Sequence, residues 1–190
     1  IALWLEAALT QYRGAGARAF FRAALLAFTC PRTVNVAMNG PPGTAKTAMG
    51  TAVCKALGGT FAGRTLSPWT TDAEILGAVD LKALQDGRLE RAHDAAHPDL
   101  LTADAFLADE WPRSTGGIRA MLLSALADRI TPTGDVVPAH VIFAASNTRL
   151  TSEEDQAAND RYAVRVDVLD VDNVDDMHAI MHREVPIRRR

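Results

Sequence analysis

The feature that most constrains the fold is the stretch from residue 34 to residue 57, where three patterns follow one another directly. An apolar run over 34–38 comes first, a loop reading GPPGTAKT over 40–47 follows, and an alanine-rich helical pattern begins at Ala48. A strand in this position delivers the chain to a glycine-rich loop, whose N–H groups and following helix N-terminus form an anion-binding nest. The stretch therefore predicts a phosphate-binding loop within an α/β domain.

Two residues of this loop have distinct chemical roles. Lys46 is expected to reach the terminal phosphates as a mobile positive charge, and the Thr47 hydroxyl to bind the Mg²⁺ that accompanies them. The alternative is a turn before an ordinary helix with a solvated lysine, and the order of the whole loop argues against it. The residues expected to bind the nucleotide are Gly40, Pro41, Pro42, Gly43, Thr44, Ala45, Lys46, Thr47 and Ala48.

Position 45 departs from the usual pattern, because Ala45 stands where a second glycine is expected. We expect Ala45 to have right-handed helical dihedrals at the start of the helix, where a methyl group carries no penalty. Gly43 would then supply the conformationally permissive turn.

The composition is that of a globular chain with one domain. The 190 residues are 48% hydrophobic and 23% charged, with a formal net charge of -3. This balance provides no global positive field for nucleic acid or an anionic membrane surface. Cys30 and Cys54 lack metal-ligand spacing, so two reduced, buried thiols in a cytoplasmic protein are expected. The apolar stretch over 19–30 is too short to span a membrane, and Ile1 begins no recognisable secretion leader.

Apolar spacing, glycines and prolines predict the remaining elements. The expected helices cover 2–9, 15–28, 45–57, 114–128 and 172–182, and a capped turn covers 71–74. The first expected strand begins at residue 33, and further strands are expected over 60–66, 139–145 and 162–169. Two small hairpins are expected over 80–92 and 129–137, and a polar loop over 153–160.

A second informative segment runs over 103–110, where apolar residues lead directly to Asp109 and Glu110. A buried strand would place both acids at its carboxyl end, where open α/β sheets bind their ligands. Asp109 is expected to hold magnesium, directly or through water, and Glu110 to polarise the water that attacks the γ-phosphate. Asn147 ends the strand predicted over 139–145, and its amide is expected to contact the γ-phosphate or that water, although such a residue alone is more typical of a turn.

Two pairs of histidines have a spacing of four residues: His93 with His97, and His178 with His182. The spacing faintly resembles that of a zinc protease helix, but Asp94 replaces the required glutamate in the first pair, and a proline follows that pair at once. Surface histidines are therefore the favoured interpretation of both pairs.

Four motifs together resemble those of one protein family. They are GPPGTAKT over 40–47, LADEWPR over 107–113, FAASN over 143–147, and Asp160-Arg161-Tyr162, which is similar to an Asp-Arg-Phe element. On these residues the chain resembles the MoxR family of AAA+ ATPases, and within it the RavA-like branch. The resemblance covers nearly the whole chain after about residue 30.

The resemblance implies a P-loop NTPase fold with an AAA+ core, a three-layer αβα sandwich whose parallel five-stranded sheet has the order 5-1-4-3-2. The expected domain is 1–190, with N-terminal helices over 1–30, the core over 31–170, and the last core helix and tail over 171–190. The two hairpins would be the helix-2 insert and the pre-sensor hairpin of the clade. The family's helical lid is expected to be absent.

The resemblance also implies roles for two polar residues and an assembly. Asn147 would be the sensor 1 residue, and Arg161 the arginine finger that reaches the γ-phosphate of a neighbouring subunit. Arg113, Arg129 and Arg165 are competitors for the finger role, and any of these arginines is also consistent with a surface ion pair. The expected assembly is a homo-oligomeric ring, usually a hexamer, with ATP at subunit boundaries.

The function expected from these residues is Mg²⁺-dependent ATP hydrolysis that drives remodelling or chaperone-like assembly of a protein partner. A nucleotide-gated binding module with little turnover is the first alternative, because the finger must come from another subunit. A DNA-associated AAA+ motor is a further alternative, which the lack of basic residues over 131–135 disfavours. GTP is disfavoured because the chain has no Asn-Lys-x-Asp element.

Overall fold

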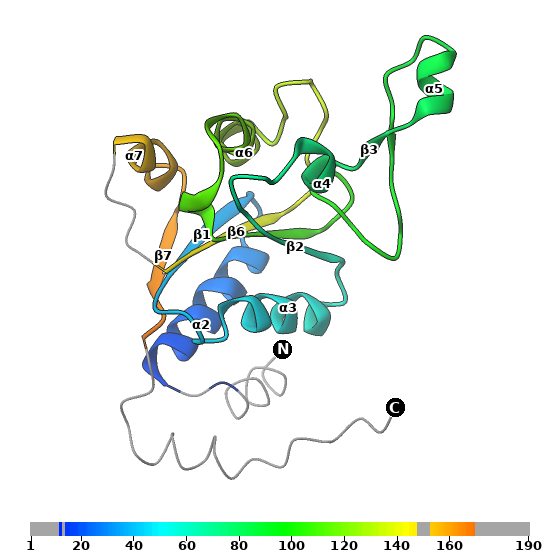
Figure 1. The fold of residues 1–190 in the computed structure, drawn as a ribbon. Helices are drawn as coiled ribbons and strands as arrows, with labels where there is room; N and C mark the ends of the chain where they lie inside the picture. The colour runs from blue at the N-terminus through cyan, green and yellow to red at the C-terminus, as the bar shows by residue number, and fades with distance from the viewer. Residues whose placement is uncertain (1–11, 13, 148–152, 170–190) are drawn as a thin grey trace, which may run out of the picture.

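The computed structural model describes residues 12, 14–147 and 153–169 (Figure 1). Its centre is a parallel five-stranded sheet. Across the sheet the strands are β2 (Phe61–Thr65), β5 (Ala105–Asp109), β6 (Val141–Ser146), β1 (Val34–Asn39) and β7 (Val164–Asp167). Counted along the chain among these five strands, the order is 5-1-4-3-2, which confirms the topology expected from the sequence.

Helices cover both faces of this sheet and complete the three layers. Helices α2 (Ala15–Thr29) and α3 (Lys46–Leu57) lie on one face, and α4 (Asp72–Leu76), α6 (Gly116–Asp128) and α7 (Glu153–Asn159) on the other (Figure 1). Successive strand side chains point to opposite faces. In β1, Val36 and Met38 accordingly pack in the core cluster beside α2 and α3, whereas Ala37 packs in the cluster beside α4 and α6.

The segment over 78–92, called the insert below, differs from the hairpin expected over 80–92. Residues Leu81–Gln85 form a short helix, α5, and not a strand. The only paired segments of the insert that the structure describes are β3 (Ala78–Val79) and β4 (Arg91–Ala92), which are antiparallel. The prediction failed because Asp80 caps a helix here: its carboxylate accepts hydrogen bonds from the N–H groups of Lys82 and Ala83 at 2.8 and 3.3 Å.

Three further expectations need correction. The polar loop expected over 153–160 contains α7, and the hairpin expected over 129–137 is reduced to one antiparallel bridge between Ile130 and Val136. Helix α6 is capped by Thr115, whose hydroxyl accepts from the N–H of Ile118 at 3.4 Å, while the expected cap, Ser114, donates to a carbonyl in the preceding 3₁₀ turn (Trp111–Arg113). By contrast, the capping box predicted within 71–74 is present at the start of α4.

Some predictions fall outside the described residues. They are the helices over 2–9 and 172–182, His178, His182 and the basic tail. Among the described residues, none of the helices combines the length and the apolar character of a membrane-spanning segment. Cys30 and Cys54 are both free thiols; Cys54 is buried as expected, whereas Cys30 is only half-buried.

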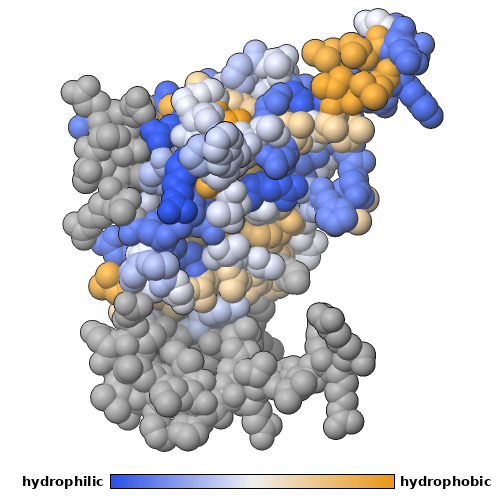
Figure 2. Space-filling model, in the orientation of Figure 1, coloured by the Kyte–Doolittle hydropathy of each residue, from blue (hydrophilic) through white to orange (hydrophobic). Residues whose placement is uncertain are grey.

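Exposed apolar side chains gather on the two excursions from the sheet. Val79, Leu81, Leu84 and Leu89 of the insert are exposed, and so are Ile130 and Val136 of the 130–136 turn. Figure 2 shows the apolar surface of the insert at the upper right, where α5 projects away from the body of the molecule.

Candidate functional site

Three parallel strands bring the candidate site residues to one edge of the sheet. β1, β5 and β6 are neighbours, so the loops at their carboxyl ends meet. A cavity of about 360 Å³ lies at this edge. It is lined by Pro42, Gly43, Thr44, Ala45, Lys46, Thr47, Ala48, Asp109, Glu110 and Asn147.

Lys46 lies beneath the loop with its ammonium group held in place. Its Nζ donates to the carbonyl oxygens of Gly40 and Pro41, each at 2.8 Å, and to Oδ1 of Asn147 at 3.0 Å. The residue is only 6% exposed. A positively charged ammonium group held at the phosphate loop by hydrogen bonds to carbonyl and amide oxygens suits a phosphate ligand.

Thr47 and Asp109 form a pair of oxygens suited to a hard divalent cation. The Thr47 hydroxyl donates to Oδ2 of Asp109 at 2.7 Å. Two oxygens that share Mg²⁺ at about 2.1 Å in octahedral geometry lie about 3.0 Å apart, close to the observed separation. The residues present therefore fit the ion that the sequence motif implies.

Glu110 has an unusual backbone and a restrained carboxylate. Its φ of 56° and ψ of 39° are left-handed, and its N–H donates to Oδ1 of Asp109 at 3.0 Å. Its Oε1 accepts from the amide of Asn147, and Nε of Arg113 lies 3.9 Å from its Oε2. A non-glycine residue in this region is strained by about 1–3 kcal/mol, and such strain clusters at functional sites. Asn147 thus contacts both Lys46 and Glu110.

The dihedrals of the phosphate loop overturn the expectation for Ala45. Its φ is 59°, so it is left-handed, and the methyl group does carry a steric penalty of about 1–2 kcal/mol. Gly43 also has a positive φ, 86°, as expected. Alternation of right- and left-handed residues turns successive N–H groups inward. Within the described residues, the N–H groups of Gly43, Thr44 and Ala45 have no backbone acceptor, so they are available to an anion.

Gly40 and Pro41 were predicted to bind nucleotide, but the structure places them beside the cavity and not in its lining. They line a separate hollow of about 190 Å³. A Cβ atom built on Gly40 would lie 1.9 Å from the carbonyl oxygen of Val168, so only glycine fits there. The requirement for glycine comes from the chain that follows β7, and no local sequence signal reveals it.

Arg161 lies apart from this cavity within its own chain. Its carbonyl accepts from the side-chain amide of Asn35 near the start of β1, whereas the phosphate loop follows the end of that strand. Its guanidinium donates to the carbonyl of Ala157 in α7. In this position Arg161 does not contact a ligand in the nucleotide cavity of its own chain.

Two competing arginines have different surroundings. Arg129 donates to Oδ1 of Asn35 at 2.7 Å and to the carbonyl of Ala125 at 2.9 Å, and burial lowers its pKa to about 10. Arg129 therefore ties α6 to β1. Arg113, in contrast, is 71% exposed and approaches Glu110, a contact that the sequence reasoning missed. Asn35 was also missed, and a polar residue within an apolar strand was its signal.

The histidines near the insert are paired with acids. His93 contacts Asp99 and His97 contacts Asp94, each at 2.7 Å. No group of three metal-ligating side chains exists within the described residues.

The parallel αβα sandwich, with a phosphate loop after β1 and an acidic strand end at β5, defines a P-loop nucleotide-binding protein with an AAA+ core. A family model that describes the MoxR domain of MoxR–vWA–β-propeller ternary systems matches residues 23–186. The chain therefore belongs to the MoxR family of AAA+ ATPases. The RavA-like branch expected from the sequence stays a prediction.

Solved structures support the same fold. A candidate ATPase of Cytophaga hutchinsonii matches with a TM-score of 0.66 and 18% identity, over 96% of this chain and 54% of that one. Two variants of Thermotoga maritima RuvB match with TM-scores of 0.56 and 0.57, at 18% and 19% identity, over 85% and 87% of this chain and 47% and 48% of theirs. The chain thus spans about half the length of these structures. Comparison with curated proteins finds no significant match.

Proposed function

We propose that this chain binds ATP with Mg²⁺ and hydrolyses it. The observation that carries the proposal is the single cavity in which the phosphate loop faces Asp109, Glu110 and Asn147. Phosphoryl transfer to water needs charge neutralisation and positioning more than covalent chemistry, and these residue types supply both.

Each side chain has one role in this proposal. Lys46 and the inward N–H groups of the loop bind the phosphates, while Thr47 and Asp109 hold the metal ion, which offsets negative charge on the phosphates. Glu110 orients and polarises the attacking water, because its carboxylate lies at the cavity wall. Asn147 contacts both Lys46 and Glu110, so it is placed to report phosphate binding to the base.

The work performed by hydrolysis is proposed to be the remodelling of a protein partner. The matched family model is named for systems that combine a MoxR domain with a vWA and a β-propeller protein. A cytoplasmic ring, hexameric as in many AAA+ proteins, that acts on partners of this kind is the proposed assembly.

A nucleotide-gated module with little turnover is the second candidate. The separation of Arg161 from its own chain's cavity favours this candidate. If the arginine finger acts only in a neighbouring subunit, an isolated subunit lacks it and hydrolyses ATP slowly.

Two substitutions test the hydrolytic proposal. Glu110→Gln should retain ATP binding and lose about 100-fold or more in turnover, because the amide cannot polarise water. Lys46→Ala should lose both binding and turnover. Binding is measured with a fluorescent ATP analogue, and turnover by phosphate release with and without Mg²⁺. Glu90→Gln, an exposed acid on the insert, is the control with the same charge change and should behave as the wild type.

Unchanged hydrolysis in Glu110→Gln would contradict the proposed mechanism. Tight ATP binding by the wild type with negligible turnover, even when subunits are assembled, would favour the nucleotide-gated module.

A further inference from the structure

A second hollow lies outside the nucleotide site. Its volume is about 480 Å³, and it is bounded by the end of β2, by α4 and by the base of the insert. It shares no lining residue with the nucleotide cavity. Nothing in the proposed hydrolysis uses it.

Trp69 stands at this hollow with 87% of its surface exposed. The loop that carries it is ordered: the N–H of Trp69 approaches Oγ of Ser67 at 3.2 Å, and the N–H of Ser67 donates to Oγ1 of Thr70 at 2.9 Å. A large aromatic side chain that projects from this turn, and that the described residues leave uncovered, offers a π face to a ligand.

The charged side chains of the hollow are one cation and three carboxylates: Arg64, Glu74, Asp94 and Asp99. The guanidinium group of Arg64 is hydrogen-bonded to backbone carbonyl groups. Its three nitrogens donate to the carbonyls of Glu74, Gly63 and Pro98 at 2.8, 2.9 and 3.1 Å. Arg64 therefore holds the backbone around the hollow in place, and Glu74 and Asp94 are the exposed carboxylates that a ligand would meet.

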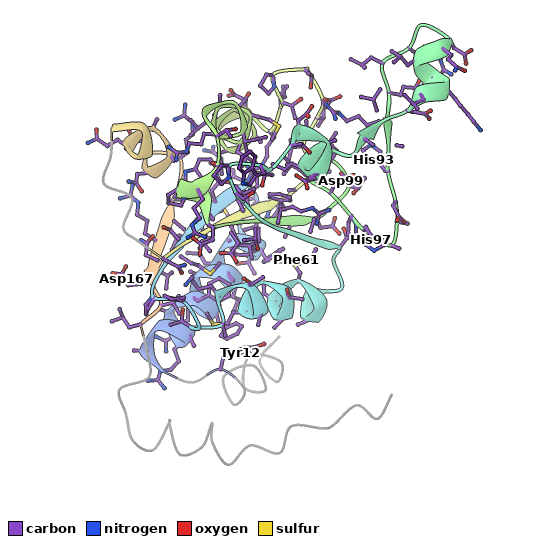
Figure 3. The ribbon with its side chains drawn as sticks, in the orientation of Figure 1. Tyr12, Phe61, His93, His97, Asp99 and Asp167 are labelled. Carbon is purple, nitrogen blue, oxygen red and sulfur yellow. The ribbon has the colours of Figure 1, made fainter. Side chains whose placement is uncertain are left out.

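Local hydrogen bonds hold these carboxylates in place. Glu74 accepts from the N–H of Thr71 at 2.7 Å, and Asp99, 5% exposed at its side chain, contacts His93 at 2.7 Å. Hydrogen bonds from His97 and from the N–H of Ala96 lower the pKa of Asp94, so this acid is charged at neutral pH. Figure 3 shows His93 beside Asp99 near the base of the insert, with His97 on the loop below them.

We propose that this hollow binds the guanidinium group of an arginine side chain in a partner polypeptide. The planar group would stack on Trp69 and donate two parallel hydrogen bonds to Glu74 or Asp94. A lysine would gain the charge attraction but neither the planar stacking nor the paired bonds. The described residues offer no three-ligand metal cluster, and the excess of carboxylates disfavours an anion.

The proposal goes beyond ATP hydrolysis and names the chemistry by which a partner is recognised. It requires no nucleotide. The two proposals therefore fail separately: loss of peptide binding leaves hydrolysis untouched, and loss of hydrolysis leaves peptide binding untouched.

The test is the affinity of fluorescein-labelled Gly-Gly-Arg-Gly-Gly for the chain, measured by fluorescence anisotropy without nucleotide. Peptides with citrulline or lysine in place of arginine are compared, since citrulline has the same shape without the charge. We expect saturable binding of the arginine peptide, several-fold weaker binding of the lysine peptide, and none of the citrulline peptide.

Three variants locate the binding. Trp69→Ala should weaken arginine binding about fivefold or more, and Glu74→Gln and Asp94→Asn about threefold each. Gln at position 74 still accepts the Thr71 hydrogen bond, so α4 keeps its cap. Glu90→Gln removes the same charge outside the hollow and should bind as the wild type does.

The proposal is wrong if the arginine peptide shows no saturable binding up to millimolar concentration. It is equally wrong if citrulline binds as tightly as arginine, or if the three variants bind as the Glu90→Gln control does. ATP hydrolysis by the three variants should equal that of the wild type.

Discussion

At the scale of single residues, Tyr162 is a buried side chain whose hydroxyl group has no hydrogen-bond partner among the described residues. It is 4% exposed, and burial raises the pKa of the phenol. The Asp-Arg-Phe element that this segment resembles has no hydroxyl group at this position. A buried polar group without a partner costs about 1–3 kcal/mol, so the tyrosine destabilises the core cluster around α6 and α7.

Tyr162→Phe should therefore raise the free energy of unfolding by about 1 kcal/mol, because it removes only the unpaired hydroxyl group. The measurement is urea unfolding followed by circular dichroism. Tyr12→Phe is the matched control: the Tyr12 hydroxyl makes an exposed hydrogen bond to the carbonyl of Ala48 at 3.4 Å, and its loss should change stability little. A clear loss of stability in Tyr162→Phe would show that the hydroxyl group is satisfied in solution.

At the scale of elements, the two ends of the insert differ. Hydrogen bonds and ion pairs fix its base, at β3 and β4, whereas few packing contacts hold its tip, α5. Nη1 of Arg91 donates to the carbonyl of Gly77 at 2.8 Å, and other nitrogens of Arg91 lie 3.6 and 3.9 Å from Asp72 and Asp135. In α5, by contrast, the only side chain buried is that of Ala83. The helix at the tip therefore depends on its cap more than on packing.

Asp80→Ala should open α5 locally without unfolding the domain. Loss of the cap costs about 1 kcal/mol, which corresponds to about fivefold faster amide exchange over 81–88. Hydrogen–deuterium exchange with mass spectrometry measures this, and global unfolding in urea should shift little. Asp86→Ala removes an acid at the other end of α5, where its exposed contact with Arg88 at 3.5 Å contributes little. If both variants exchange at the same rate, the Asp80 cap does not stabilise the helix.

At the scale of the whole molecule, the proposed finger role of Arg161 requires more than one subunit for turnover. Arg161 lies near the start of β1 and the nucleotide cavity at its end, so a finger role requires a neighbouring subunit. A head-to-tail contact that repeats and closes gives a ring. The mass of the particle with a non-hydrolysable ATP analogue reports directly whether such a ring forms.

Mixing two inactive variants tests this arrangement. Under the proposed roles, Glu110→Gln keeps the finger Arg161 but lacks the base, and Arg161→Ala keeps the base Glu110 but lacks the finger. In an equal mixture, random assembly places an intact base opposite an intact finger at about a quarter of the contacts. Phosphate release should therefore recover to about a quarter of the wild-type rate. No recovery, with mixed rings present, would contradict the proposal that Arg161 acts in a neighbouring subunit.

The sequence by itself determined the phosphate loop and the acids that end a buried strand, because each depends on residue spacing within one strand, loop or helix. The parallel sheet and its strand order were expected from the family resemblance. The Gly-Pro-Pro-Gly loop predicts its strand and helix, and Asp109 and Glu110 follow an apolar strand of recognisable length. The tertiary structure alone decided that Ala45 is left-handed, that Gly40 must leave room for Val168, and that Arg161 lies far from its own cavity. The positions of Gly40 and Arg161 depend on contacts with Val168 and Asn35, which are distant in the chain, and such contacts leave no local pattern.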